Sequence, residues 1–296
     1  SEDRREAQTA FTLAQVKCWV SVLSCFLLAC LYVGSLYVWR SSLPRDHPSV
    51  IKHLCVSVLL VSALSPAVVK TWMHWVDVRV SIHGSSSLIL FSFTSPGSHK
   101  QLFYSTQQVF YLGPFVHSAM DDPDGFTGEL QSALDVQSWR LCMRDAVWLR
   151  NQVVAPVTEE LVFRGAMLPM LVPCAGPTAA IFVAPLFFGV AHFHHVIEQR
   201  RLGKDNILTS SSRLIKSVIC VSEGHVVGPV LCYSFCNSQG LPDVTSALQH
   251  PQHPALLFSY LMGILLFLVL LFPLTDPFFY GAIPVCSLAP PPTSVC

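Results

Sequence analysis

Residues 155–169 read APVTEELVFRGAMLP, a stretch in which two adjacent glutamates and one arginine stand between apolar flanks. A charged side chain at the centre of a membrane helix costs about 2.5–3.5 kcal/mol on insertion scales, so such residues are usually paired or functional. In an α-helix Glu160 and Arg164 face the same way and can form an ion pair, whereas Glu159 points about 100° away. The stretch therefore predicts one carboxylate held by an arginine and a second carboxylate available as a base.

The composition around this stretch is typical of a membrane protein. The chain has 296 residues, of which 52% are hydrophobic and 12% charged, and its mean hydropathy is +0.50. A soluble domain has about 25% charged residues. The 18 basic and 18 acidic residues cancel, which argues against a nucleic-acid partner and a charged disordered chain. We expect an all-α, polytopic bundle of roughly six to eight membrane helices.

Uncharged stretches place the expected membrane helices, since about 20 apolar residues cross the hydrocarbon core of a bilayer. The predicted spans are residues 18–39, 54–69, 101–120, 226–241 and 255–274. In residues 76–100, by contrast, apolar residues alternate with serine and glycine, so no element is assigned there.

Four prolines divide the uncharged stretch 165–197, and a proline inside a helix removes a backbone hydrogen bond and breaks or kinks the helix. We therefore predict a helix end, a turn around 173–177 and a new helix that runs to His195. The helix that contains the glutamates is predicted to begin near Pro156 or Thr158.

One membrane domain is expected over residues 18–276, with its core motifs in 151–240. Residues 1–17 are expected to form a segment of cytosolic type, and residues 277–296 a proline-rich tail. The basic loop 198–216 is followed by no further lysine or arginine, so the positive-inside rule places this loop in the cytosol.

The eleven cysteines show neither CxxC pairs nor the spacing of a disulfide framework. Six of them lie in apolar runs, where a free thiol behaves as a small hydrophobic side chain. These six predicted free thiols are Cys18, Cys25, Cys30, Cys55, Cys232 and Cys236.

A second polar group lies in PLFFGVAHFHH at 185–195, where Phe188 and His192 are four residues apart on an otherwise apolar helix. A single buried histidine is more often structural than catalytic, but the acidic pair on the preceding helix favours a catalytic role. His194 and His195 stand at the helix end and are expected at the membrane surface.

A third polar group lies in CYSFCNSQG at 232–240, where Tyr233 and Asn237 are also four residues apart. An asparagine in a membrane helix needs a hydrogen-bond partner. That partner is either a neighbouring helix or a reacting carbonyl group. The Glu/Arg group has a structural alternative as well, an ion cluster that ties helices together.

Together, EELVFR, FFGVAH and the helix that ends in Asn237 resemble motifs of the type II CAAX prenyl endopeptidases, a family that also includes bacterial immunity-type membrane proteins. The eukaryotic, Ras-converting branch is matched most closely, in the phrases YVGSLYVW, LPRDHP, WLRNQVVAPVTEELVFRGAMLPML, PLFFGVAHFHHVIEQ, GHVVGPVLCYSFCN and PLTDPFFYG. The resemblance covers most of the chain. It implies a protease of the endoplasmic reticulum membrane that removes the last three residues (aaX) from prenylated CaaX proteins such as Ras-like small GTPases.

The resemblance also implies roles for individual residues. Glu159 would be the general base that activates water, His192 would hold and polarise that water, and Asn237 would stabilise the oxyanion. Organising and packing roles would fall to three neighbours: Glu160, Arg164 and Phe188.

Three features depart from the family pattern. Tyr233 stands where the family has the histidine of His-x-x-x-Asn, and a phenol cannot become a cationic donor near neutral pH. Residues 198–221 contain too short an apolar run to form the membrane span that the family has there. Residues 73–100 lack the long apolar helices that the family pattern leads us to expect. These departures favour an alternative, a catalytically impaired or inactive relative that binds prenylated peptides or is only structural.

Two further classes of protein fit the sequence less well. A zinc protease that uses His192, His194 and His195 lacks HExxH and an obvious third ligand, so we expect no metal. A proton-coupled transporter would show repeated halves, and no internal repeat is present. No Gly-rich phosphate loop suggests an organic cofactor.

Overall fold

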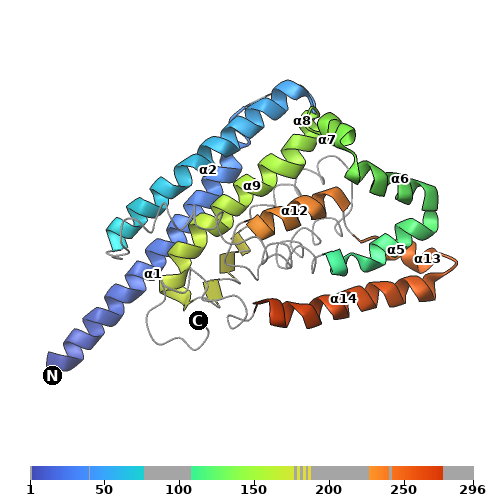
Figure 1. Ribbon diagram of the computed structural model, residues 1–296. Helices are drawn as coiled ribbons and strands as arrows, with labels where there is room; N and C mark the ends of the chain where they lie inside the picture. Colours follow the sequence, from blue (N-terminus) through green and yellow to red (C-terminus); the bar gives the residue numbers. More distant parts are fainter. Residues whose placement is uncertain are drawn as a thin grey trace.

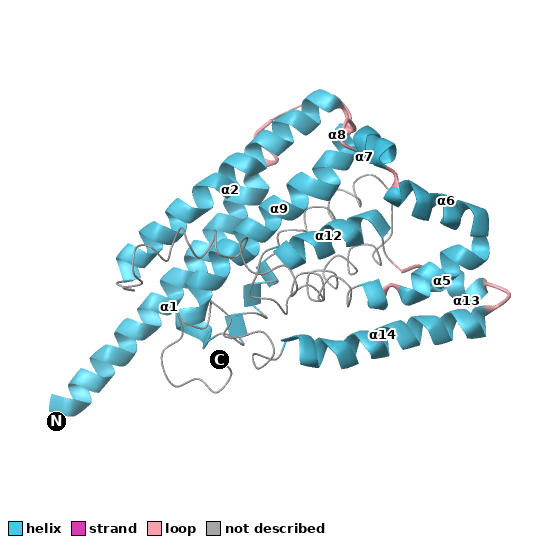
Figure 2. Cartoon of the chain, viewed as in Figure 1, coloured by secondary structure: helices cyan, strands magenta, loops and turns pink. Residues whose placement is uncertain are grey.

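The computed structural model describes most of the chain as helices (Figure 1). The described residues are 2–39, 41–76, 108–176, 179–180, 183–184, 186–187, 227–239 and 242–275. Every regular element in these ranges is helical, as Figure 2 shows, which confirms the all-α prediction for this part of the chain.

Three helices of the described part are long and apolar enough to cross a membrane. They are Lys17–Ser35 within α1 (Glu2–Ser35), α2 (Pro48–Val76), and His253–Leu270 within α14 (His253–Thr275). The predicted spans 54–69 and 255–274 are therefore confirmed as helices, and the predicted span 18–39 is confirmed up to Ser35, where α1 ends. The helix α2 extends past Lys52 and Lys70, which flank the predicted span, because a lysine on the helix surface can carry its ammonium group towards water.

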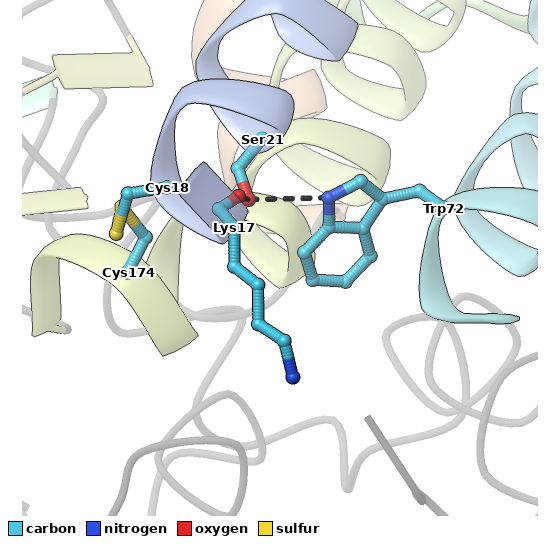
Figure 3. The surroundings of a disulfide bond; sticks show 5 residues. All are labelled: Lys17, Cys18, Ser21, Trp72 and Cys174. Carbon is cyan, nitrogen blue, oxygen red and sulfur yellow. Dashed lines mark hydrogen bonds between the residues drawn. A yellow bond between two sulfur atoms is a disulfide. The ribbon is translucent and has the colours of Figure 1, made fainter. Parts of the chain in front are cut away.

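The helices α1 and α2 form an antiparallel pair that two indole groups tie together (Figure 1). Near one end, Trp39 Nε1 donates to Ser57 Oγ at 2.7 Å. Near the other, Trp72 Nε1 donates to Ser21 Oγ at 3.1 Å, and Trp72 is buried (Figure 3). The Trp72 bond satisfies two buried polar groups inside the interface between the helices, and the Trp39 bond joins the half-exposed end of the pair.

The stretch 155–169, called the acidic motif from here on, lies in one continuous helical run from Ala146 to 176. Its segments are α8 (Ala146–Leu149), the π-helix η1 (Arg150–Val154), α9 (Ala155–Glu159), the π-helix η2 (Glu160–Ala166) and the helical residues 167–176. In a π-turn the backbone bonds to the fifth residue instead of the fourth, and the Ala155 N–H accordingly donates to the Arg150 carbonyl.

The predicted start of this helix at Pro156 or Thr158 is wrong. The run begins at the N-cap Asp145, whose carboxylate accepts a hydrogen bond of 2.9 Å from the Val147 N–H. Pro156 has no N–H group to donate. It is tolerated inside the run because the adjoining π-turn shifts the backbone hydrogen bonds by one residue and so changes which carbonyl groups need a donor. The run ends at Gly176, whose φ of 77° is left-handed, in agreement with the predicted turn there.

The largest core cluster lies where this run packs against α1 and α2. Val162, Ala166, Met167 and Met170 are completely buried there. On its other side the run packs against α12 (Val227–Gln239), which contacts η1 and α9 (Figure 1). The acidic motif is therefore enclosed by three helices that come from distant parts of the chain.

A covalent bond joins α1 to the end of the same run. Cys18 and Cys174 form a disulfide across 156 positions of sequence, with Cα atoms 5.0 Å apart (Figure 3). The prediction of a free thiol at Cys18 is wrong, because tertiary packing brings together two cysteines that share no local spacing. The other five predictions are confirmed, since these thiols form no disulfide: Cys25, Cys232 and Cys236 are buried, Cys55 is half-buried and Cys30 is exposed.

The second half of the bundle is built on α5 (Leu112–Asp121) and α14, which lie side by side (Figure 1). Gly113 leaves no room for a Cβ beside Tyr260, and a Cβ at Gly263 would stand 2.9 Å from the Val109 carbonyl oxygen. Small residues on both helices allow this close approach. Of the predicted span 101–120, residues 101–107 lie outside the described part.

A polar cluster closes one end of this helix pair. Asp121 Oδ2 lies 3.2 Å from His117 Nε2, and Asp121 Oδ1 lies 3.3 Å from His250 Nε2. The Gln252 N–H donates to His250 Nδ1, and the Tyr260 hydroxyl lies 3.3 Å from His117 Nδ1. This cluster links the end of α5 to α14 and to the residues just before α14.

Short helices connect the two halves: α6 (Pro123–Leu134), α7 (Val136–Cys142) and, before α14, α13 (Val244–Gln249). Acidic residues cap their N-termini, as expected for turns of this type. The backbone N–H groups of Ser138 and Gln137 bind the Asp135 carboxylate and lower its pKa.

Candidate active site

Three consecutive buried polar residues occupy the centre of the helical run. Thr158 is completely buried, and Glu159 and Glu160 are each 9% exposed. Buried carboxylates are stable only where partners compensate for lost hydration. The surroundings of these two glutamates therefore determine what the site can do.

Glu160 and Arg164 form the predicted ion pair. Arg164 Nη1 lies 2.7 Å from Glu160 Oε2, and both side chains are about nine-tenths buried. The segment that holds them is the π-helix η2 instead of a regular α-helix. Single π-turns inside α-helices are frequent at functional sites, and no pattern in the sequence indicated this one.

Glu159 faces a different partner. The Tyr233 hydroxyl of α12 forms a side-chain hydrogen bond with Glu159, and the phenol is the donor because an ionised carboxylate only accepts. The structure thus brings together the predicted base and the residue that stands in place of the family histidine. The predicted pairing of Glu160 with Arg164 is confirmed, and Glu159, predicted to be available as a base, has the Tyr233 hydroxyl as a partner.

Asn237 lies one turn beyond Tyr233 on α12, and its Nδ2 donates to the backbone carbonyl of Asn151 at 2.8 Å. This bond joins α12 to η1, so the structural alternative for Asn237 is present in the fold. An asparagine amide has two N–H groups, so this contact uses only half of its donor capacity.

Sequence reasoning missed a second contact between the same two segments. Ser234 Oγ lies 2.9 Å from the Gln152 side-chain amide. One orientation of the Gln152 amide gives hydrogen-bond partners to both its nitrogen and its oxygen. In it the nitrogen donates to Ser234, and the oxygen accepts from the Ser238 N–H. The only available signal was the polar pair Asn151-Gln152 directly before the acidic motif.

Two more missed residues approach the motif from the opposite side. The Tyr32 hydroxyl of α1 lies 2.8 Å from Thr158 Oγ1, and Ser62 Oγ of α2 lies 3.3 Å from the Thr158 carbonyl oxygen. Tyr32 belongs to the phrase YVGSLYVW, which was noted only as part of a resemblance.

Phe188 and His192 lie outside the described residues. The predicted contact between Glu159 and His192 therefore stays a prediction, as do the packing of Phe188 and the surface position of His194 and His195. Among the described residues no group of three His, Cys, Asp or Glu side chains is arranged to hold a metal ion, and the histidines of the zinc alternative are not in that part.

Comparison with known proteins gives consistent results. The family model of type II CAAX prenyl endopeptidase, Rce1-like, matches residues 145–239. CAAX prenyl protease 2 of Rattus norvegicus is 50% identical over 273 residues, which are 92% of this chain and 85% of that protein. The Homo sapiens protein of that name is 47% identical over 285 residues, covering 92% and 86%.

More distant relatives extend the comparison. The probable CAAX prenyl protease 2 of Schizosaccharomyces pombe is 28% identical over 265 residues, covering 82% of this chain and 89% of that protein. No solved structure gives a significant match.

Proposed function

The chain belongs to the family of type II CAAX prenyl endopeptidases, and we propose on that premise that it removes the last three residues (aaX) from prenylated CaaX proteins. The observation that carries the proposal is the 50% identity over 92% of the chain. The matched family region, residues 145–239, contains both glutamates, Arg164 and Asn237.

Glu159 is the proposed general base. It takes a proton from water, and the water oxygen bonds to the carbonyl carbon of the peptide bond that follows the prenylated cysteine. The tetrahedral intermediate then breaks its C–N bond, and the amine of the leaving tripeptide takes the proton from Glu159. His192 is proposed to hold the water.

Asn237 and Tyr233 are the proposed donors for the negative charge that develops on the carbonyl oxygen. The phenol has one hydrogen, which it donates to Glu159 in the resting site. Once Glu159 has taken the proton of the water, the phenol is proposed to turn that hydrogen to the oxyanion. Donors of this kind contribute about 2.7–4 kcal/mol each where this has been measured. The buried Glu160–Arg164 pair fixes the helix beside them.

The proposed substrates are prenylated CaaX proteins, including Ras-like small GTPases, and the proposed location is the endoplasmic reticulum membrane. Large apolar side chains are exposed along α1, α2 and α14, for example Leu27, Leu60 and Val269. A surface of this kind is stable against lipid. It would let an isoprenyl chain stay in the bilayer while its peptide reaches Glu159.

The test is release of the tripeptide from a farnesylated CaaX peptide by the pure chain in liposomes, followed by mass spectrometry. We expect cleavage after the modified cysteine and far slower cleavage of the same peptide without its isoprenyl group. We also expect full activity after thorough chelation, since no metal or organic cofactor is proposed. Loss of activity on chelation would favour the zinc alternative.

The inactive relative remains the second candidate, and the observation that favours it is Tyr233. It predicts that the farnesylated peptide binds and is not cleaved, and that Tyr233→His restores cleavage. Cleavage by the unchanged chain would exclude it.

A further inference from the structure

Tyr32 of α1 is buried next to the acidic motif, although nothing so far gives it a role in the reaction. It is 4% exposed, and its hydroxyl lies 2.8 Å from Thr158 Oγ1, a residue 126 positions away in sequence. Its ring packs edge-on against the ring of Phe163, with the two ring centroids 5.5 Å apart. A buried hydroxyl that bonds the residue directly before the proposed base is well placed to control that base.

The direction of this hydrogen bond follows from the other contacts of Thr158. Thr158 Oγ1 lies 2.7 Å from the Val154 carbonyl oxygen and 3.3 Å from that of Ala155. A carbonyl oxygen only accepts, and a threonine hydroxyl has one hydrogen. The Thr158 hydrogen is therefore directed to the backbone, and Tyr32 donates to Thr158.

This chain of hydrogen bonds anchors a segment of unusual backbone. The single turn α9 (Ala155–Glu159) lies between the π-helices η1 and η2. Regular hydrogen bonding changes on both sides of it, so its position depends more than usual on contacts with other helices. Tyr32 from α1 binds Thr158 within this turn. Ser62 of α2 donates to the Val58 carbonyl at 2.8 Å, and its Oγ lies 3.3 Å from the Thr158 carbonyl oxygen.

Tyr32 also stands near the charged groups of the site. Its hydroxyl is close enough to interact electrostatically with Glu159 and with Tyr233. Glu159 thus has one phenol on the α12 side and a second on the α1 side. The first bonds the carboxylate, and the second bonds the preceding residue.

We propose that Tyr32 and Thr158 form a positioning pair that holds Glu159 in its reactive orientation. The inference rests on the proposed function of Glu159 as the base. Tyr32 acts through Thr158, because its hydroxyl is committed to that residue. Such residues matter because small displacements of a catalytic group lower the rate strongly.

The test measures kcat and KM for Tyr32→Phe, Thr158→Val and the double variant with a farnesylated peptide. Each single variant should lower kcat about tenfold, the effect of one lost hydrogen bond on a positioned group, with KM unchanged. The double variant should be no slower than the slower single variant. Thr158→Ser, which keeps the hydroxyl, should retain most of the activity.

Two matched controls separate this role from general destabilisation. Tyr37→Phe removes an exposed phenol just beyond the end of α1, and Thr71→Val removes an exposed threonine hydroxyl that bonds a backbone carbonyl four residues earlier. Both should leave kcat unchanged. If Tyr32→Phe does not fold, Thr158→Val tests the same bond from its other end.

Hydrogen exchange gives a readout that does not depend on activity. In Tyr32→Phe, the amides of 155–160 should exchange faster than in the wild type, whereas Thr71→Val should not change them. If exchange is faster in Tyr32→Phe but the wild type cleaves no peptide, the contact between Tyr32 and Thr158 is supported and the proposed function is refuted. Unchanged exchange and unchanged kcat in Tyr32→Phe, or effects that multiply in the double variant, would overturn the pair.

Discussion

Tyr233 is the residue that most affects the chemistry proposed for this chain. Its hydroxyl donates to Glu159, so it can supply at least one of the hydrogen bonds that the histidine of the family pattern would supply. The structure thus favours a chemically competent arrangement in which a neutral phenol faces the base.

The first prediction concerns this phenol. Tyr233→Phe removes the donor and keeps the ring, and it should lower kcat by a factor of about 10² to 10³ if the hydroxyl stabilises the transition state. Tyr233→His should keep activity at or above the wild-type level. Steady-state tripeptide release measures both variants. Full activity of Tyr233→Phe would show that the hydroxyl has no part in the reaction.

The second prediction concerns the buried ion pair. Arg164→Met leaves Glu160 buried without its partner at 2.7 Å, which typically costs about 3–5 kcal/mol. The double variant Glu160→Gln/Arg164→Met removes both charges and should recover much of that loss. Thermal unfolding in detergent measures the difference, and a double variant less stable than Arg164→Met would contradict the pairing.

For single residues, the sequence predicted the contacts that helix periodicity determines. Four-residue spacing placed Glu160 beside Arg164, and the neighbouring position separated Glu159 from that pair. Spacing could not show that Asn237 bonds the Asn151 carbonyl or that Tyr32 reaches Thr158. Those contacts depend on how distant helices meet, and one sequence contains no signal for that.

Among the elements, the helical run 146–176 shows how tertiary structure changes local expectations. Pro156 suggested a helix start, but two π-turns accommodate it inside a continuous run. The disulfide between Cys18 and Cys174 was likewise invisible to spacing rules. Apolar length, by contrast, predicted α1, α2 and α14 correctly, because burial in a bilayer depends on composition over about 20 residues.

The third prediction tests the disulfide. Cys18→Ser should lower the thermal stability by roughly 2–4 kcal/mol, since it releases a long closed loop. Cys18→Ser/Cys174→Ser should be no less stable than the single variant. Cys30→Ser, which replaces an exposed free thiol, serves as the control. An additive loss in the double variant would mean that the two sulfur atoms are not bonded.

The fourth prediction tests the contact between α5 and α14. Gly113→Ala places a Cβ against Tyr260, so the helices must separate, at a cost of about 1–3 kcal/mol. Gly128→Ala in α6 meets nothing within 4 Å and should be neutral or stabilising. Equal stability of the two variants would contradict the close approach.

On the scale of the whole molecule, the fold holds two buried glutamates between helices from three distant parts of the chain. The pair α1 and α2 contacts one side of the acidic motif, and α12 contacts the other. Membrane helices keep these walls rigid while their outer faces remain apolar. The arrangement explains how two carboxyl groups can be buried between helices whose outer faces are apolar.

The most direct test of the central claim compares Glu159→Gln with Glu129→Gln, which neutralises an exposed glutamate on α6, in liposomes that contain a farnesylated CaaX peptide. The account predicts that the wild type and Glu129→Gln release the tripeptide and that Glu159→Gln, folded and equally stable, releases none above background. Tripeptide release by Glu159→Gln at a rate near that of the wild type would contradict the assignment of Glu159 as the base.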